Sequence, residues 1–196
     1  MVRDDGELTD LEEVIVYKKR SGNDNIFYKE IIKRKLMDNS QLIRAIDNPD
    51  LDPECPEDYL GENILPYYLL TNTQTKAQNY ICYETSFTNV LDGNRILKQG
   101  QIIFYILCIE KNIYDKETGI ARHDLLAALL EDEFNWCTDF GTQLKLVSDR
   151  PYATDGAFVL RTLTFEQTTT NGIVDPRLGV LDENNIPSGR IITDER

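Results

Sequence analysis

The sequence predicts an α+β fold, in which helices pack on a largely antiparallel four- to five-stranded sheet, with extended N- and C-terminal arms. The chain has 196 residues, which is enough for one core plus arms but short for two ordinary domains. Apolar residues recur at helical spacing in two regions and at strand spacing in two pairs of segments. We therefore expect an arm at residues 1–24, one domain at residues 25–170 and an extended tail at residues 171–196.

The N-terminal arm contains one short apolar run among acidic clusters. Val14, Ile15, Val16 and Tyr17 are followed by the basic residues KKR and by the turn-forming stretch SGNDN. Such a run is too short to build a core, but it can pair with an exposed sheet edge, either of its own subunit or of a neighbour. Packing on its own subunit is the equal alternative.

Two helices and a long loop are expected next. From Asn25 onwards one face is apolar and the other basic, and the apolar positions are Phe27, Tyr28, Ile31, Ile32 and Leu36. A break at residues 38–40 can cap a second, short helix, which ends before Asn48. Residues 48–66 are rich in proline and acidic side chains, so we expect no regular element there.

Two strands are predicted at residues 80–88 and 101–111, separated by the turn-rich stretch 89–100. The first alternates between apolar and polar residues, whereas Ile102 to Ile109 is apolar at every position. The second pattern is typical of a central strand covered on both faces. If helices cover only one face, loops, the arm or another subunit must cover the other.

A helix at residues 122–136 and a second strand pair at residues 142–148 and 156–168 complete the domain. The inner stripe of the helix comprises Leu125, Leu126, Leu129, Leu130 and Phe134. In the last strand, Val159, Arg161, Leu163 and Phe165 share one face. The tail that follows is polar and rich in turn-forming residues.

Charge and composition exclude some classes of function. The formal net charge of −13 disfavours tight nucleic-acid binding, which depends on basic residues, although an acidic surface can let DNA slide past. The longest apolar run is too short for a membrane span, and the acidic N-terminus is unlike a signal peptide. Cys55, Cys82, Cys108 and Cys137 match neither metal-binding pairs nor a disulfide framework, so we expect reduced thiols and assembly in the cytoplasm.

No catalytic, cofactor or metal site is predicted. His123 is the one histidine, and it is expected as a polar group in the capping region of an exposed helix start. No phosphate-binding glycine motif is present. The densest carboxylate cluster lies in the proline-rich loop, at Asp50, Asp52, Glu54, Glu57 and Asp58. These residues leave a carboxylate-dependent, metal-using enzyme as the alternative from another class.

From Asn25 to Thr170 the chain resembles the tail terminator, or tail-completion, proteins of long-tailed bacteriophages. The resemblance rests on the helix IFYKEIIKRKLMDN, the strand pair YICYETSFT and QIIFYILCIEK, the helix ARHDLLAALLEDEF and the closing pair LKLVSDRPYATDGAFVLRTLTFE. These are patterns of arrangement and not signature motifs. The long arms are additions to the family's minimal pattern.

The resemblance implies a virion protein at the head–tail junction that works without a cofactor. It would form a homo-oligomeric ring, commonly hexameric, that caps the tail tube and contacts the tail tube protein and the head-connector proteins. A head-completion or connector protein of the neck is the closest alternative, and a generic acidic adaptor is a further one. We expect partner contacts at residues 14–17 and at Leu91, Asp92, Gly93 and Asn94, in the loop between the two apolar strands.

Overall fold

The computed structural model describes residues 24–68, 77–88, 97–116, 118–152 and 158–170. These residues all belong to one compact unit, residues 24–171. The described elements are the helices α2 (Asp24–Asp38), α3 (Ser40–Ile46) and α4 (Arg122–Phe134), the strands β1 (Ile64–Leu65), β2 (Tyr80–Thr88), β3 (Leu97–Ile109), β4 (Lys145–Tyr152) and β5 (Phe158–Thr170), and the short 3-10 turns η1 (Pro56–Tyr59) and η3 (Glu110–Asn112). None of the described helices is both long and apolar enough to cross a membrane.

The five described strands form one sheet in the order β1-β2-β3-β5-β4. β1 runs parallel to β2, and the other three pairings are antiparallel. β3 lies in the centre, with β2 and β5 as its neighbours. The predicted α+β class with a largely antiparallel sheet is therefore confirmed.

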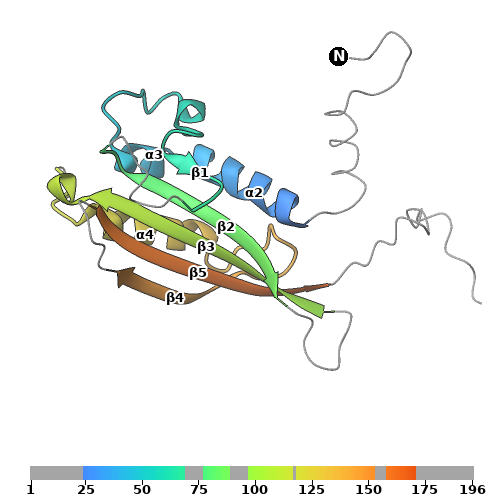
Figure 1. Ribbon diagram of the computed structural model, residues 1–196. Helices are drawn as coiled ribbons and strands as arrows, with labels where there is room; N and C mark the ends of the chain where they lie inside the picture. Colours follow the sequence, from blue (N-terminus) through green and yellow to red (C-terminus); the bar gives the residue numbers. More distant parts are fainter. Residues whose placement is uncertain (1–23, 69–76, 89–96, 117, 153–157, 171–196) are drawn as a thin grey trace, which may run out of the picture. The chain divides into compact units, whose positions relative to one another are not determined.

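The described helices lie on one face of this sheet (Figure 1). Ile102, Phe104, Ile106 and Cys108 of β3 point toward the helices and are fully buried. Around them lies an aromatic cluster, in which the ring of Phe104 is 4.8 Å from that of Phe134 and 5.9 Å from that of Phe165. The predicted strand faces of β3 and β5 are thus correct, and they place the main core between the sheet and α4.

α2 buries the predicted stripe with one exception. Tyr28, Ile31, Ile32 and Leu36 are buried, but Phe27 is exposed, because it lies beside the stripe and not on it. The hydroxyl of Tyr28 donates to the carbonyl of Phe140, 3.1 Å away, and accepts a hydrogen bond from the amide of Gln167 in β5. These bonds connect the start of α2 to the end of β5.

β3 begins four residues earlier than predicted. Leu97 to Gly100 belong to the strand because they pair with Thr170 to Gln167 of β5, although lysine, glutamine and glycine have little strand propensity. Glycine allows close packing at position 100, since a Cβ atom there would lie 3.1 Å from the Phe87 ring and 3.4 Å from the Tyr28 ring, and these rings would have to shift slightly. The loop between β2 and β3 therefore spans residues 89–96 and not 89–100.

The fold predicts that the thiol of Cys55 reacts before those of Cys82 and Cys108. Cys82 and Cys108 are fully buried in the sheet, and burial raises the pKa of the Cys108 thiol to about 12, whereas Cys55 is exposed. We expect iodoacetamide to alkylate Cys55 in the native protein and to leave Cys82 and Cys108 unmodified until the protein is unfolded. Peptide mass spectrometry after timed labelling measures this, and C55S provides the control. Rapid native labelling of Cys108 would contradict the buried β3.

Candidate functional site

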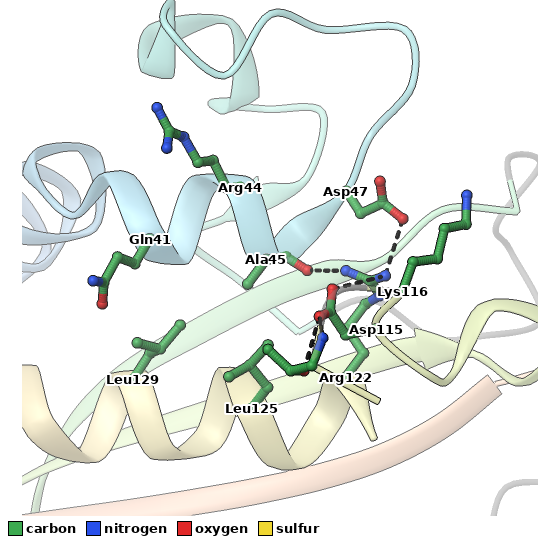
Figure 2. A pocket seen from close by; sticks show the side chains of 10 residues that line it. Gln41, Arg44, Ala45, Asp47, Asp115, Lys116, Arg122, Leu125 and Leu129 are labelled. Atoms are coloured by element: carbon green, nitrogen blue, oxygen red, sulfur yellow. Dashed lines mark hydrogen bonds and ion pairs between the residues drawn. The ribbon is translucent and has the colours of Figure 1, made fainter. Parts of the chain in front are cut away.

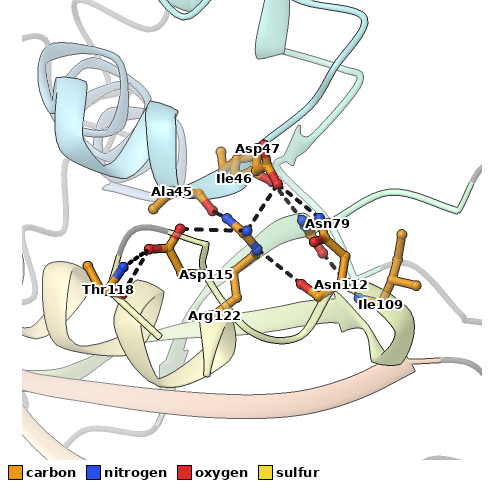
Figure 3. Close-up of polar contacts among 9 residues, drawn as sticks. All are labelled: Ala45, Ile46, Asp47, Asn79, Ile109, Asn112, Asp115, Thr118 and Arg122. Carbon is orange, nitrogen blue, oxygen red and sulfur yellow. Dashed lines mark hydrogen bonds and ion pairs between the residues drawn. The ribbon is translucent and has the colours of Figure 1, made fainter. Parts of the chain in front are cut away.

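Arg122, the first residue of α4, is the largest fully buried side chain and is charged, with 1% of its surface exposed. Its Nη1 donates to the carbonyl of Ala45 (2.6 Å), and its Nε donates to the carbonyl of Asn112 (3.3 Å). Its Nη2 lies 3.0 Å from the Asp47 carboxylate and 3.7 Å from that of Asp115 (Figure 3). We call these five residues the Arg122 cluster. A buried guanidinium needs such complete pairing, because an unpaired buried charge is strongly destabilising.

A buried network of amide side chains continues from the cluster. Asn79 donates to the carbonyl of Ile46 (2.7 Å) and accepts a hydrogen bond from the backbone of Ile109 (3.1 Å) (Figure 3). Asn63 donates to the carbonyl of Asn79 (2.8 Å) and accepts from Asn48 (2.7 Å). These bonds connect the C-terminal end of α3 with the start of β2 and the end of β3.

A pocket of about 540 Å³ lies beside the Arg122 cluster, between α3 and α4 (Figure 2). Leu125 and Leu129 of α4 form its apolar wall, and Arg44, Lys116 and Asp47 lie on its polar side. All three nitrogens of the Arg122 guanidinium already bind protein groups, and the side chain is 1% exposed, so it presents almost no surface to a ligand. We interpret the cluster as a structural link between α3, α4 and the sheet.

The face of the sheet opposite the helices is the second candidate surface, and we call it the open face. At one end it is apolar: Leu65, Tyr80, Cys82 and Leu107 are buried there, and Tyr105, Phe158 and Leu160 pack against them half-buried. Tyr68 covers Tyr105, with the two rings 4.4 Å apart. The prediction that β3 carries apolar residues on both faces is therefore confirmed.

At its other end the open face is polar. Glu166 of β5 accepts hydrogen bonds from Gln99 (2.5 Å) and Gln101 (3.1 Å) of β3. A shallow groove of about 560 Å³ lies over these residues, and Lys145 and Val147 of β4 line its side. The open face thus changes along the strands from a half-buried aromatic surface to an amide-rich one.

The two edges of the sheet differ. Just before β4, the backbone of Leu144 is hydrogen-bonded to the backbones of Trp136 and Cys137. The Asn135 side chain accepts a hydrogen bond from the backbone N–H of Leu146, so these residues cover the first part of the outer edge of β4. Farther along, a bulge follows Leu146, and Pro151 has no N–H to donate. The β4 edge is therefore protected against pairing with another strand.

The outer edge of β2 is only partly covered. β1 pairs with Ile81 and Cys82, and Pro66 then ends β1. The next residues turn onto the open face, where the backbone N–H of Tyr68 donates to Glu84 (3.4 Å). Within the described ranges, no strand pairs with the outer edge of β2 from Thr85 to Phe87. Among the described strands, none covers this part of the β2 edge.

Only some of the site residues predicted from the sequence lie in the part of the chain that the structure describes. Residues 14–17 and 91–94 lie outside the described residues. The acidic side chains of the proline-rich loop are exposed, and Glu54 pairs with Arg44 (2.8 Å). In the part of the chain that the structure describes, no group of three or more His, Cys, Asp or Glu side chains is arranged to bind a metal ion.

His123 does lie in the first turn of α4, but its side chain is mostly buried and caps nothing. Its Nε2 is 3.2 Å from Asp124, and α4 has no side-chain cap. Asp124 instead contacts Arg161 of β5, which also binds both carboxylate oxygens of Asp149 in β4, at 2.7 and 2.6 Å. The expected position of His123 and Asp124 in the first turn is thus correct, but the side chain of Asp124 is 45% exposed and that of His123 only 15%, so the expected exposure of His123 is wrong.

The sequence analysis missed the Arg122 cluster. One signal was available, since an arginine in the first turn of a helix is unfavourable next to the positive end of the helix dipole. Its presence in ARHD therefore suggests carboxylate or carbonyl partners elsewhere in the chain. The identity of those partners depends on distant residues such as Ala45 and Asp47, which no local pattern shows.

A sequence model of a family described as YomW matches residues 16–167, more than half of the chain. Among curated proteins, none matches the chain.

The Arg122 cluster gives a stability prediction. We expect R122M to lower the free energy of unfolding by about 2–4 kcal/mol, because it leaves the carbonyls of Ala45 and Asn112 without this donor. The two carboxylates keep other partners, since Asn112 donates to Asp47 and Thr118 donates to Asp115. R44M, in α3, is the matched control, since it removes only the exposed ion pair between Arg44 and Glu54. It should lower the free energy of unfolding by at most about 1 kcal/mol. Urea unfolding followed by circular dichroism measures both. Equal losses in the two variants would contradict the role assigned to Arg122.

Proposed function

The chain belongs to the YomW family and is a phage-related protein, and from this premise we propose that it is a structural virion protein at the head–tail junction. We propose specifically a tail terminator. It forms a homo-oligomeric ring, hexameric in the simplest case, that caps the tail tube and contacts the head-connector proteins.

The observation that carries the proposal is the one-sided coverage of the sheet. The described helices cover one face, and the open face keeps half-buried aromatic and aliphatic side chains at Tyr105, Phe158 and Leu160. Contiguous apolar surface of this kind is typical of contacts with other proteins. It supports a protein that acts by binding its own copies and its neighbours in the particle.

The charge balance supports a position beside DNA without binding it. The net charge of −13 gives the chain a negative surface potential, which repels phosphates. A ring of such subunits lets DNA pass through its opening without retaining it. The proposal therefore includes no sequence-specific nucleic-acid contact, no cofactor and no catalytic step.

Tail length in particles that lack the protein tests the proposal. Loss of a terminator leaves tube growth without a stop, so we expect overlong tails that carry no heads. Loss of a head-completion or connector protein instead gives tails of normal length beside unjoined heads. Negative-stain electron microscopy of lysates from a deletion mutant measures tail length, and a plasmid copy of the gene provides the control. Tails of normal length would exclude the terminator role.

The loop between β2 and β3 tests the partner-contact residues. We propose that residues 91–94, with the sequence LDGN, contact a partner in the assembled particle. Replacement of residues 89–96 by a glycine and serine linker of equal length should reduce assembly at least tenfold and leave the melting temperature nearly unchanged, because surface loops contribute little to stability. Size-exclusion chromatography with light scattering measures assembly. A matched replacement of residues 153–157, the β4–β5 loop, is the control. Unchanged assembly would remove the first loop from the interface.

A further inference from the structure

The backbone of β2 has unpaired hydrogen-bonding groups on its outer side. The N–H of Ile81 donates outward to the carbonyl of Asn63, 2.8 Å away. Because backbone groups of successive residues in a strand point to alternate sides, the N–H and C=O groups of Thr85 and Phe87 also point outward. No described strand pairs with them, since β1 ends at Leu65. The side-chain hydroxyl of Thr85 is also buried without a hydrogen-bond partner.

Such an edge can accept one extended segment by strand addition. The described domain does not supply a second suitable edge, because the bulge and Pro151 protect β4. A closed ring of more than two subunits needs two different surfaces that meet head to tail. In a ring, the strand that pairs with β2 must therefore come from outside the five described strands.

The N-terminal segment has the composition that this edge requires. Val14, Ile15, Val16 and Tyr17 have high strand propensity, and Lys18, Lys19 and Arg20 follow them. Two carboxylates flank the β2 edge. Glu84 lies on the open face beside Tyr105, and Glu30 of α2 is exposed on the helix side. The ammonium groups of Lys29, which binds the carbonyl of Pro66 (2.7 Å), and of Lys98, over the Phe87 ring (4.2 Å), lie near the same edge, so the edge carries charges of both signs.

The length of the connection is also sufficient. Six residues, 18–23, separate Tyr17 from Asp24 at the start of α2. Fully extended, six residues span about 20 Å. Because Tyr28 in the first turns of α2 packs on Phe87, with the rings 5.3 Å apart, α2 begins beside a β2 edge and the connection is long enough to reach such an edge.

We propose that residues 14–17 of a neighbouring copy add as a strand to the outer edge of β2, at Thr85 to Phe87. This inference rests on the proposed ring, for which it provides one subunit contact. It names the acceptor edge and the segment that fills it.

Hydrogen exchange of single amides in the full-length protein tests the proposal. In the dilute monomer, the amides of Glu84 and Ser86 point toward β3 and should be protected, whereas those of Thr85 and Phe87 should exchange freely. On concentration into the assembled form, we expect exchange at Thr85 and Phe87 to slow by about tenfold or more. Two-dimensional NMR or fragment-resolved mass spectrometry measures these rates, and light scattering on the same samples reports the assembly.

A pair of matched variants identifies the segment. The double variant I15P/V16P removes the backbone N–H groups of residues 15 and 16. It should abolish both assembly and the slower exchange at Thr85 and Phe87. The double variant I15T/V16T keeps the N–H groups and the β-branched side chains, and should retain both.

Each other outcome counts against the inference. Protection of Thr85 and Phe87 in a dilute monomer would show that the chain's own segment occupies the edge and would overturn the contact between copies. Assembly with free exchange at both residues would overturn the strand addition but leave the proposed function standing. A lack of assembly at every concentration, with free exchange at both residues, would count against both.

Discussion

The described helices can cover only one face of a five-stranded sheet, and the rest of the structure follows from this constraint. β3 is apolar from Ile102 to Ile109, so half of its side chains enter the core with α4 and the other half face away from it. Part of that second half is buried by local packing around Leu107, and Ile103 and Tyr105 stay half-exposed. The sequence of β3 therefore contains more apolar surface than the described domain buries.

The position of α3 depends on polar contacts at its C-terminal end as well as on its buried apolar side chains, Leu42, Ile43, Ala45 and Ile46. With seven residues, α3 has few intrahelical bonds, and its last carbonyls need partners. Arg122 binds the carbonyl of Ala45, and Asn79 binds that of Ile46, while Asp47 adopts a left-handed conformation that closes the helix. Side chains from α4 and from Asn79, the residue before β2, thus cap the end of α3. This arrangement fixes α3 against α4 and the start of β2.

The elements with a clear local period could be predicted from the sequence. β2 alternates over its whole length, and α4 has apolar residues at helical spacing, so both were placed within two residues of their observed bounds. The start of β3 was missed because Lys98, Gln99 and Gly100 are in a strand only through their pairing with β5, which is distant in the sequence. β1 has two residues and no detectable period. In the candidate site, the continuous apolar run of β3 predicted apolar side chains on the open face, but the Arg122 cluster depends on contacts across more than 70 residues.

The difference between the two sheet edges is informative about assembly. A protein that needed only to stay soluble would protect both edges, since an unpaired edge invites association with other chains. Here β4 is protected by a bulge, a proline and the Asn135 side chain, whereas Thr85 and Phe87 of β2 have unpaired groups within the described domain. The net charge of −13 opposes aggregation through that edge, because copies of like charge repel one another. A contact that forms must therefore offset this repulsion locally, and the basic residues at 18–20 provide positive charge directly after the apolar run. Strong overall repulsion combined with one unprotected edge favours selective pairing over aggregation.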